Sequence, residues 1–185
     1  MSKLCKYSDR ELFAALKSKD KRESESAFAE VYSRHSQRVY AYCLRVSGNE
    51  DDARDIFQEA FLKFYNSLGN IEYLDNISGY IIKIARNLCL NHRRDKKVTV
   101  DFDDMNFFSN DEKYEQKELL DLIAASLELL DFKHREAFVL RQYQGMTYNE
   151  ISAITGDSVS AIKNRVWRAK EKIKEILSPY LEDLS

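Results

Sequence analysis

Residues 147–173, TYNEISAITGDSVSAIKNRVWRAKEKI, contain two helical patterns separated by a short turn. Thr147 and Glu150 have the spacing of a capping box, in which each side chain accepts a backbone N–H at the start of a helix. Gly156 is expected to stop this short helix, and Ser158 can cap the longer one that follows. Two helices joined by a tight turn with a glycine are typical of a helix-turn-helix, which places its second helix against DNA.

The second of these helices is strongly basic. From Ser158 to Glu175 there are six basic and two acidic residues, although the whole chain has a formal net charge of -2. On a helical wheel the apolar residues share one face, formed by Val159, Ile162, Val166, Ala169 and Ile173. The opposite face consists of Ser160, Ala161, Asn164 and Arg168, with Lys163 and Arg165 at its flanks. Amide and guanidinium donors suit base edges in a major groove, so these six residues are the predicted DNA-binding site. We expect Trp167 to pack at the edge of the domain and Pro179 to lie just past the helix end.

The composition favours helices over strands. The chain has 185 residues with five glycines and one proline, too few to separate the many short strands of a sandwich or barrel. Hydrophobic residues make up 44% of the chain, enough for packed cores, and charged residues make up 32%. No run of about 18 uncharged apolar residues occurs, and charges are scattered through the N-terminus, so we expect a cytoplasmic protein with no membrane insertion.

Periodicity and charge indicate two parts. The first half is expected to be a bundle of about four helices, with helices near 25–47, 50–68 and 79–94, and Asn49 is placed to cap the second of these. Residues 98–112 contain five acids and no base, directly after the basic run HRRDKK, and mark a boundary. The predicted fold is therefore all-α, with two small helical domains at 1–97 and 115–185 joined by a flexible acidic linker at 98–114.

With these motifs in view, the sequence resembles bacterial sigma factors, most closely the two-domain extracytoplasmic-function group. The resemblance rests on DDARDIFQEAF at 51–61, GYIIKIARNLCLNHRRDKK at 79–97 and the helix-turn-helix block, in that order and separated by an acidic segment. It implies an RNA polymerase sigma factor, whose first domain binds the clamp helices of core polymerase and melts the minus-ten element. The second domain would read the minus-thirty-five element and rest on the polymerase flap.

The resemblance also implies the roles of residues in the first domain. In the DDARDIFQEAF helix, the residues expected to bind the polymerase clamp are Asp51, Asp52, Asp55, Gln58, Glu59 and Phe61. In the segment from Asn70 onward, the residues expected to hold the melted promoter strand are Tyr73, Tyr80, Lys83, Arg86, Asn87, Asn91, Arg93 and Arg94. Rings and amides can take an extruded base, and cations can hold the backbone.

Three positions depart from the common family pattern. Tyr80 stands where many members have tryptophan, Asn91 where many have aspartate, and Ala161 where threonine is frequent. Tyr80 keeps an aromatic ring, Asn91 keeps a polar group, and Ala161 can still contact a thymine methyl. The three departures therefore affect the expected base preference rather than the function. The expected partners are core polymerase, through its clamp and flap, and promoter DNA, both duplex and single-stranded. An anti-sigma factor is left open as a further partner.

Two other classes of function compete with this interpretation. A response regulator or ligand-gated repressor can end in a similar helix-turn-helix, but it usually needs a sensor domain with strands, and the first half has no buried-strand runs alternating with helices. An enzyme is disfavoured because the three histidines and three cysteines lack metal-ligand spacing, and no phosphate-binding glycine loop or nucleophile elbow occurs. No catalytic residue, cofactor or metal is therefore predicted.

Overall fold

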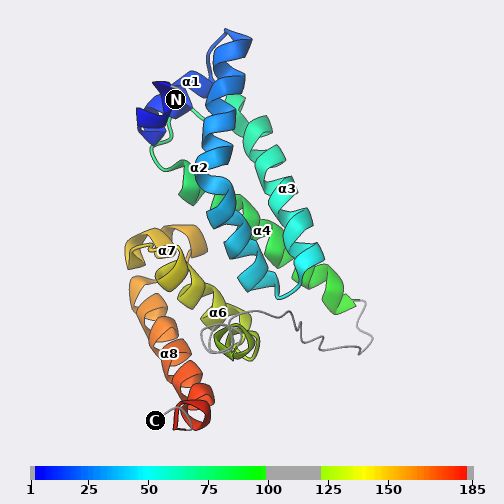
Figure 1. Cartoon of the computed structure of the whole chain (residues 1–185), viewed down its shortest axis with the longest axis vertical. Helices are drawn as coiled ribbons and strands as arrows, with labels where there is room; N and C mark the ends of the chain where they lie inside the picture. Colours follow the sequence, from blue (N-terminus) through cyan, green and yellow to red (C-terminus); the bar gives the residue numbers. More distant parts are fainter. Residues whose placement is uncertain (1–2, 99–121, 183–185) are drawn as a thin grey trace. The chain divides into compact units, whose positions relative to one another are not determined.

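The computed structural model describes residues 3–98 and 122–182. The chain divides into two compact units, Met1–Asn91 (unit 1) and His92–Ser185 (unit 2). Within the described residues every regular element is a helix, so the all-α prediction is confirmed (Figure 1). The predicted linker at 98–114 lies outside the described residues except for Val98, the last residue of a helix.

Unit 1 is built around two long antiparallel helices. Helix α2 (Lys21–Ser47) packs along α3 (Glu50–Ser67), and Figure 1 shows them side by side. The short helix α1 (Asp9–Leu16) packs on α2, preceded by the 3-10 turn η1 (Lys3–Lys6). A second 3-10 turn, η2 (Leu68–Asn70), follows α3 and leads through a loop to α4 (Ile77–Val98). The core of unit 1 contains the fully buried side chains of Leu12, Val31, Val39, Tyr42, Phe64, Ile77, Ile81 and Ile82.

Local signals set several ends of these helices, as predicted. Gly48 ends α2 in the left-handed conformation, with φ of 71°. The Asn49 side chain then caps α3 by accepting the backbone N–H of Asp52 at 3.0 Å. The 3-10 turn containing Gly69 follows the end of α3.

The N-terminal end of unit 1 differs from the prediction. Helix α2 begins at Lys21, capped by Asp20, rather than near residue 25. Helix α1 was not located from the sequence, which indicated about four helices but placed only three, although Ser8 and Glu11 form a complete capping box at its start. Helix α4 spans Ile77–Val98 rather than 79–94. At its start, the Asn76 side chain accepts the N–H of Gly79 at 2.7 Å, and the N–H of Ile77 donates to the side chain of Asp9, a residue far away in the sequence.

Unit 2 contains the helix-turn-helix. After helical turns at 122–128, α6 (Phe132–Phe138) runs into a π-helical segment, η3 (Val139–Tyr143), which closes where Gly145 takes φ of 65°. Helix α7 (Tyr148–Thr155) and the long α8 (Val159–Glu182) follow. Helix α8 packs on both α6 and α7 through the side chains of Ile162, Val166, Ala169 and Ile173.

The predicted end of α8 is wrong. Pro179 lies inside this helix, which continues to Glu182. Proline removes one backbone donor, a loss that is expensive in a helix interior. Here it falls in the last turns of a 24-residue helix, whose earlier part is already fixed by packing on α6 and α7.

Candidate protein-binding and DNA-binding surfaces

The turn of the helix-turn-helix is fixed by side chains on both sides. The Thr147 hydroxyl accepts the backbone N–H of Glu150 at 3.2 Å, and the Glu150 carboxylate accepts the N–H of Thr147 at 2.7 Å, so the predicted capping box is present. Gly156 ends α7 with φ of 78°, a value that glycine adopts without strain. The Ser158 hydroxyl accepts the N–H of Ala161 at 3.3 Å, which caps α8 as predicted.

One face of α8 is exposed and polar. Ser160, Lys163, Asn164 and Arg168 are exposed there, while Ala161 is half-buried. On the other side, Ile162 and Val166 are buried against the rest of unit 2. The structure therefore brings most of the predicted DNA-binding residues of this helix onto one accessible surface.

Two residues of α8 lie differently from the expectation. The Trp167 side chain is 61% exposed, so it is not packed at the edge of the domain but lies on the accessible side of the helix. The Arg165 side chain is only 17% exposed and donates to both carboxylate oxygens of Asp157, at 2.5 and 2.9 Å. This hydrogen-bonded pairing with Asp157 is the main reason that the pKa of Arg165 is raised above its usual value.

Helix α4 carries the residues predicted to hold melted DNA. Tyr80, Lys83, Asn87, Asn91 and Arg94 recur at spacings of three and four, so they share one face of the helix. Lys83, Asn87, Asn91, Arg93 and Arg94 are exposed, whereas Arg86 is half-buried. Tyr80 is also half-buried, and its ring packs edge-on against Phe64 with centroids 6.2 Å apart.

Tyr73 lies in the loop before α4 and is the most accessible ring of this group. Its side chain is 54% exposed, and its hydroxyl donates to the Asp75 carboxylate at 3.2 Å. A ring held at its edge but open over much of its surface can stack on a base.

Helix α3 presents acidic residues to the surface. Asp51, Asp55, Gln58 and Glu59 are exposed, and Asp52 is half-buried. Arg54 forms an ion pair with Asp51 at 3.5 Å, and Lys63 forms one with Glu59 at 3.0 Å, both within the helix. Phe61, which was expected at the polymerase contact, is only 4% exposed.

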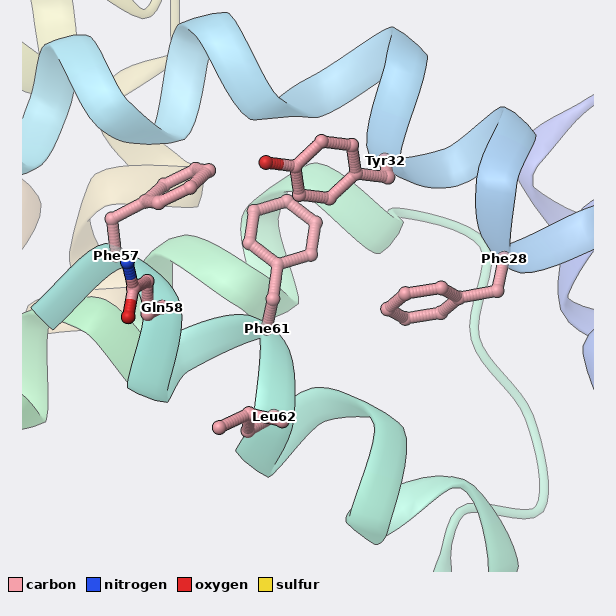
Figure 2. Close-up of a pocket in the computed structure, with 6 residues that line it drawn as sticks. All are labelled: Phe28, Tyr32, Phe57, Gln58, Phe61 and Leu62. Atoms are coloured by element: carbon pink, nitrogen blue, oxygen red, sulfur yellow. The ribbon is translucent and has the colours of Figure 1, made fainter. Parts of the chain in front are cut away.

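Phe61 forms part of an aromatic groove between α2 and α3. The groove has a volume of about 310 Å³ and is lined by Phe28, Tyr32, Phe57, Gln58, Phe61 and Leu62. Figure 2 shows Tyr32 of α2 beside Phe61 of α3, and their ring centroids are 5.0 Å apart. Leu62 is 64% exposed and Tyr32 is 44% exposed, so apolar surface remains accessible along this groove.

Sequence reasoning missed the α2 side of this groove. Phe28 and Tyr32 are four residues apart on α2, so helical spacing alone places them on one face. That signal was available, but it does not distinguish a buried stripe from an accessible one.

The described residues contain neither a cluster of three metal-ligating side chains nor a helix long and apolar enough to cross a membrane. The candidate surfaces are thus arrangements of exposed polar, basic and aromatic side chains on helices.

Both halves of the chain are similar in sequence to known proteins. Residues 31–99 match the family model for sigma-70 region 2, and residues 120–173 match the model for sigma-70 region 4. The RNA polymerase sigma-H factor of Pseudomonas aeruginosa is 28% identical, over 97% of this chain and 99% of that protein. The ECF RNA polymerase sigma factor SigW of Bacillus subtilis is 26% identical, over 85% of this chain and 92% of that protein.

Solved structures agree in fold. The structure of CnrH, determined in complex with the cytosolic domain of CnrY, has a TM-score of 0.67 and 26% identity, covering 92% of this chain and 97% of that one. The sigma factor RpoE of Bartonella quintana, determined with the anti-sigma factor NepR, has a TM-score of 0.71 and 22% identity, covering 82% and 96%. Two family matches in the expected order, with relatives aligned over nearly their whole length, do not favour the alternative of a helix-turn-helix response regulator or repressor. The chain belongs to the sigma-70 family, as an RNA polymerase sigma factor of the extracytoplasmic-function type.

Proposed function

We propose that this sigma factor divides promoter recognition between two domains, residues 1–97 and 115–185, joined by the acidic segment 98–114. The C-terminal domain binds the duplex minus-thirty-five element, and the N-terminal domain binds core polymerase and the melted minus-ten strand. The observation that supports this division best is the exposed polar face of α8, which lies opposite a buried stripe in a helix-turn-helix capped at both helices.

For the upstream element, the proposed contacts are Ser160, Ala161, Lys163, Asn164 and Arg168, with Trp167 extending the same side of α8. Asn164 and Arg168 can donate to base edges, and Lys163 can neutralise a phosphate. The Lys163 ammonium lies 5.7 Å from the centre of the Tyr148 ring, so α7 helps to place this cation. Arg165, predicted with this group, already pairs with Asp157.

For the melted element, the proposed contacts are Tyr73, Tyr80, Lys83, Arg86, Asn87, Asn91, Arg93 and Arg94. The cations among them would follow the phosphate backbone, while Tyr73 offers an accessible ring for an unpaired base. Asn87 and Asn91 are one turn apart on the same exposed face, and their amides can bond the edges of unpaired bases.

For core polymerase, the proposed contacts are Asp51, Asp52, Asp55, Gln58 and Glu59 on α3, together with the aromatic groove that contains Phe61. A charged rim beside an accessible apolar centre is the usual composition of a protein-binding surface. Leu62 and Tyr32 supply exposed apolar area, and the acids would attract a basic helix pair.

In this proposal the chain acts by binding, and the polymerase performs the chemistry, so the chain is not an enzyme. The cytoplasm is the proposed location, since both binding partners are found there. An anti-sigma factor that covered the groove would compete with polymerase, and it is the proposed further partner.

The experiment compares two double variants on one promoter with purified core polymerase. Replacing Asn164 and Arg168 with alanine should weaken closed-complex formation by filter binding, at about 1–3 kcal/mol for each lost base contact. Replacing Arg93 and Arg94 with alanine should leave upstream binding largely intact but reduce unpaired thymines in permanganate footprints. Lys174→Ala, exposed further along α8, controls for loss of a positive charge. Equal loss of binding and opening in both double variants would contradict the division.

A further inference from the structure

Helix α1 contacts the loop that carries Tyr73. This loop, residues 71–76, has no regular secondary structure and joins η2 to α4. Three side chains contact this loop: Lys17, the C-cap residue of α1, at the beginning of the loop, Arg10 in the middle, and Asp9 at the end. Helix α1 also lies before residue 31, where the match to sigma-70 region 2 begins.

At the beginning of the loop, the Lys17 ammonium donates to the backbone carbonyl of Ile71 at 2.6 Å. Lys17 is the C-cap residue of α1, and its ammonium lies 5.6 Å from the ring of Phe13, a core residue of the same helix. The ammonium thus contacts both a core ring of α1 and the loop backbone. A hydrogen bond from a charged donor is stronger than one between neutral groups.

In the middle of the loop, the Arg10 guanidinium lies 5.1 Å from the centre of the Tyr73 ring. A cation at this distance is attracted to the electron-rich face of the ring. The Tyr73 hydroxyl is held at the other end by Asp75. The ring thus has contacts that define its orientation, yet 54% of its surface stays accessible.

At the end of the loop, the Asp9 carboxylate accepts the backbone N–H of Ile77, the first residue of α4, at 2.9 Å. Asp9 is itself near Arg34 and His35 of α2, at 3.8 and 3.6 Å. The first N–H groups of a helix lack partners within it, so a carboxylate there fixes the point where the helix begins. Helix α1 therefore stabilises the start of the DNA-facing helix, together with Asn76, whose side chain accepts the N–H of Gly79 at 2.7 Å.

From these three contacts we propose that α1 is a positioning element for base capture, in which Arg10 and Lys17 hold the loop so that Tyr73 is ready to stack on one unpaired promoter base. This inference rests on the proposed function of Tyr73 in the melted element. A loop held in its binding conformation before DNA arrives loses less conformational entropy on binding. Arg10 and Lys17 are positioning residues here, since the ring rather than either cation contacts the base.

The test uses the full chain bound to core polymerase and a forked promoter probe whose minus-ten segment is single-stranded on the non-template strand. The double variant Arg10→Met and Lys17→Met keeps a flexible, unbranched side chain at both positions but removes the two positive charges. We expect it to bind the forked probe about tenfold more weakly than wild type. Binding to core polymerase, and to a duplex probe with only the upstream element, should not change. Lys19→Met, an exposed lysine two residues beyond Lys17, is the matched control and should behave as wild type.

Base preference separates positioning from a general loss of structure. The forked probe is prepared with each of the four bases in turn at the unpaired position that Tyr73 is proposed to contact. The affinity of the double variant should differ less among these four probes than the affinity of wild type does. Lys17→Arg, which keeps a charged donor, should restore much of the affinity lost by Lys17→Met. If the double variant binds the forked probe as Lys19→Met does, the inference is overturned while the proposed function stands. It is equally overturned if affinity for core falls in the same proportion as affinity for the fork. If wild type with core shows no preference for the forked probe over duplex, the proposed function itself fails.

Discussion

The ion pair between Arg165 and Asp157 gives the sharpest stability prediction. Both carboxylate oxygens accept from the guanidinium, and the two side chains are 17% and 30% exposed. Exposed ion pairs contribute about 0–1 kcal/mol, and breaking a fully buried pair costs about 3–5 kcal/mol. For this bidentate, partly buried pair we expect a coupling energy of about 1.5 kcal/mol, since its geometry is favourable but water still reaches the carboxylate.

A double-mutant cycle measures this energy. Arg165→Ala, Asp157→Ala and the double variant are unfolded in urea, with fluorescence of Trp167 as the probe. Trp167 is the chain's single tryptophan and lies on α8, so its signal reports on unit 2. We expect the double variant to be scarcely less stable than either single variant, because each single change already breaks the pair.

Arg168→Ala is the matched control for this cycle, because Arg168 is exposed on the same helix. It should change the unfolding free energy by less than about 0.5 kcal/mol, as is usual for surface substitutions, while weakening binding to duplex promoter DNA. The reasoning is refuted if the coupling energy between Arg165 and Asp157 is near zero and Arg165→Ala weakens DNA binding as much as Arg168→Ala does. Arg165 would then be a direct DNA contact, as its sequence position alone suggests.

Three further predictions concern other surfaces. Thr147→Ala removes the α7 cap and should cost about 1 kcal/mol in urea unfolding, whereas Thr147→Ser should cost much less; equal losses would show that the hydroxyl is not the cause. Leu62→Asp should weaken binding to core polymerase without lowering the unfolding temperature, because Leu62 is exposed in the groove. Leu129→Asp is the control, since Leu129 is similarly exposed but lies in unit 2. Equal effects of the two variants on core binding would contradict the proposal that the groove binds polymerase. The pKa of Asp9 is lowered chiefly by the His35 imidazole, whose Nε2 lies 3.6 Å from the carboxylate, and also by the N–H that Asp9 accepts from α4. The stabilising effect of this carboxylate is therefore complete above about pH 4 and is lost as pH falls below that. The unfolding temperature of wild type should therefore fall more steeply between pH 5 and 3, roughly, than that of Asp9→Asn; parallel curves would count against this effect.

Local sequence signals were enough for much of the fold. Thr147, Gly156 and Ser158 act through neighbours within four residues, so the helix-turn-helix could be placed from spacing alone. The same holds for the junction of α2 and α3, where a left-handed glycine is followed by an asparagine cap.

The remainder depends on contacts between distant residues. Asp9 meets Ile77, and Lys17 meets Ile71, only after the chain has folded, so no local pattern could reveal the role of α1. Periodicity places Phe61 on the apolar face of α3, but only packing against Tyr32 decides that it is buried. Likewise, helical periodicity places Arg165 beside the exposed face of α8. Only the structure shows that its guanidinium donates to Asp157, which lies in the turn before this helix.

The most direct test of the central claim is transcription by purified core polymerase from a library of randomised promoters, with and without this protein. Sequencing of the transcript ends and their templates should show initiation that depends on the protein. The selected templates should share two sequence blocks at a fixed spacing, one for each DNA-binding surface. Initiation no greater than with core alone, or initiation without shared sequence blocks, would contradict the assignment of this chain as a promoter-specific sigma factor.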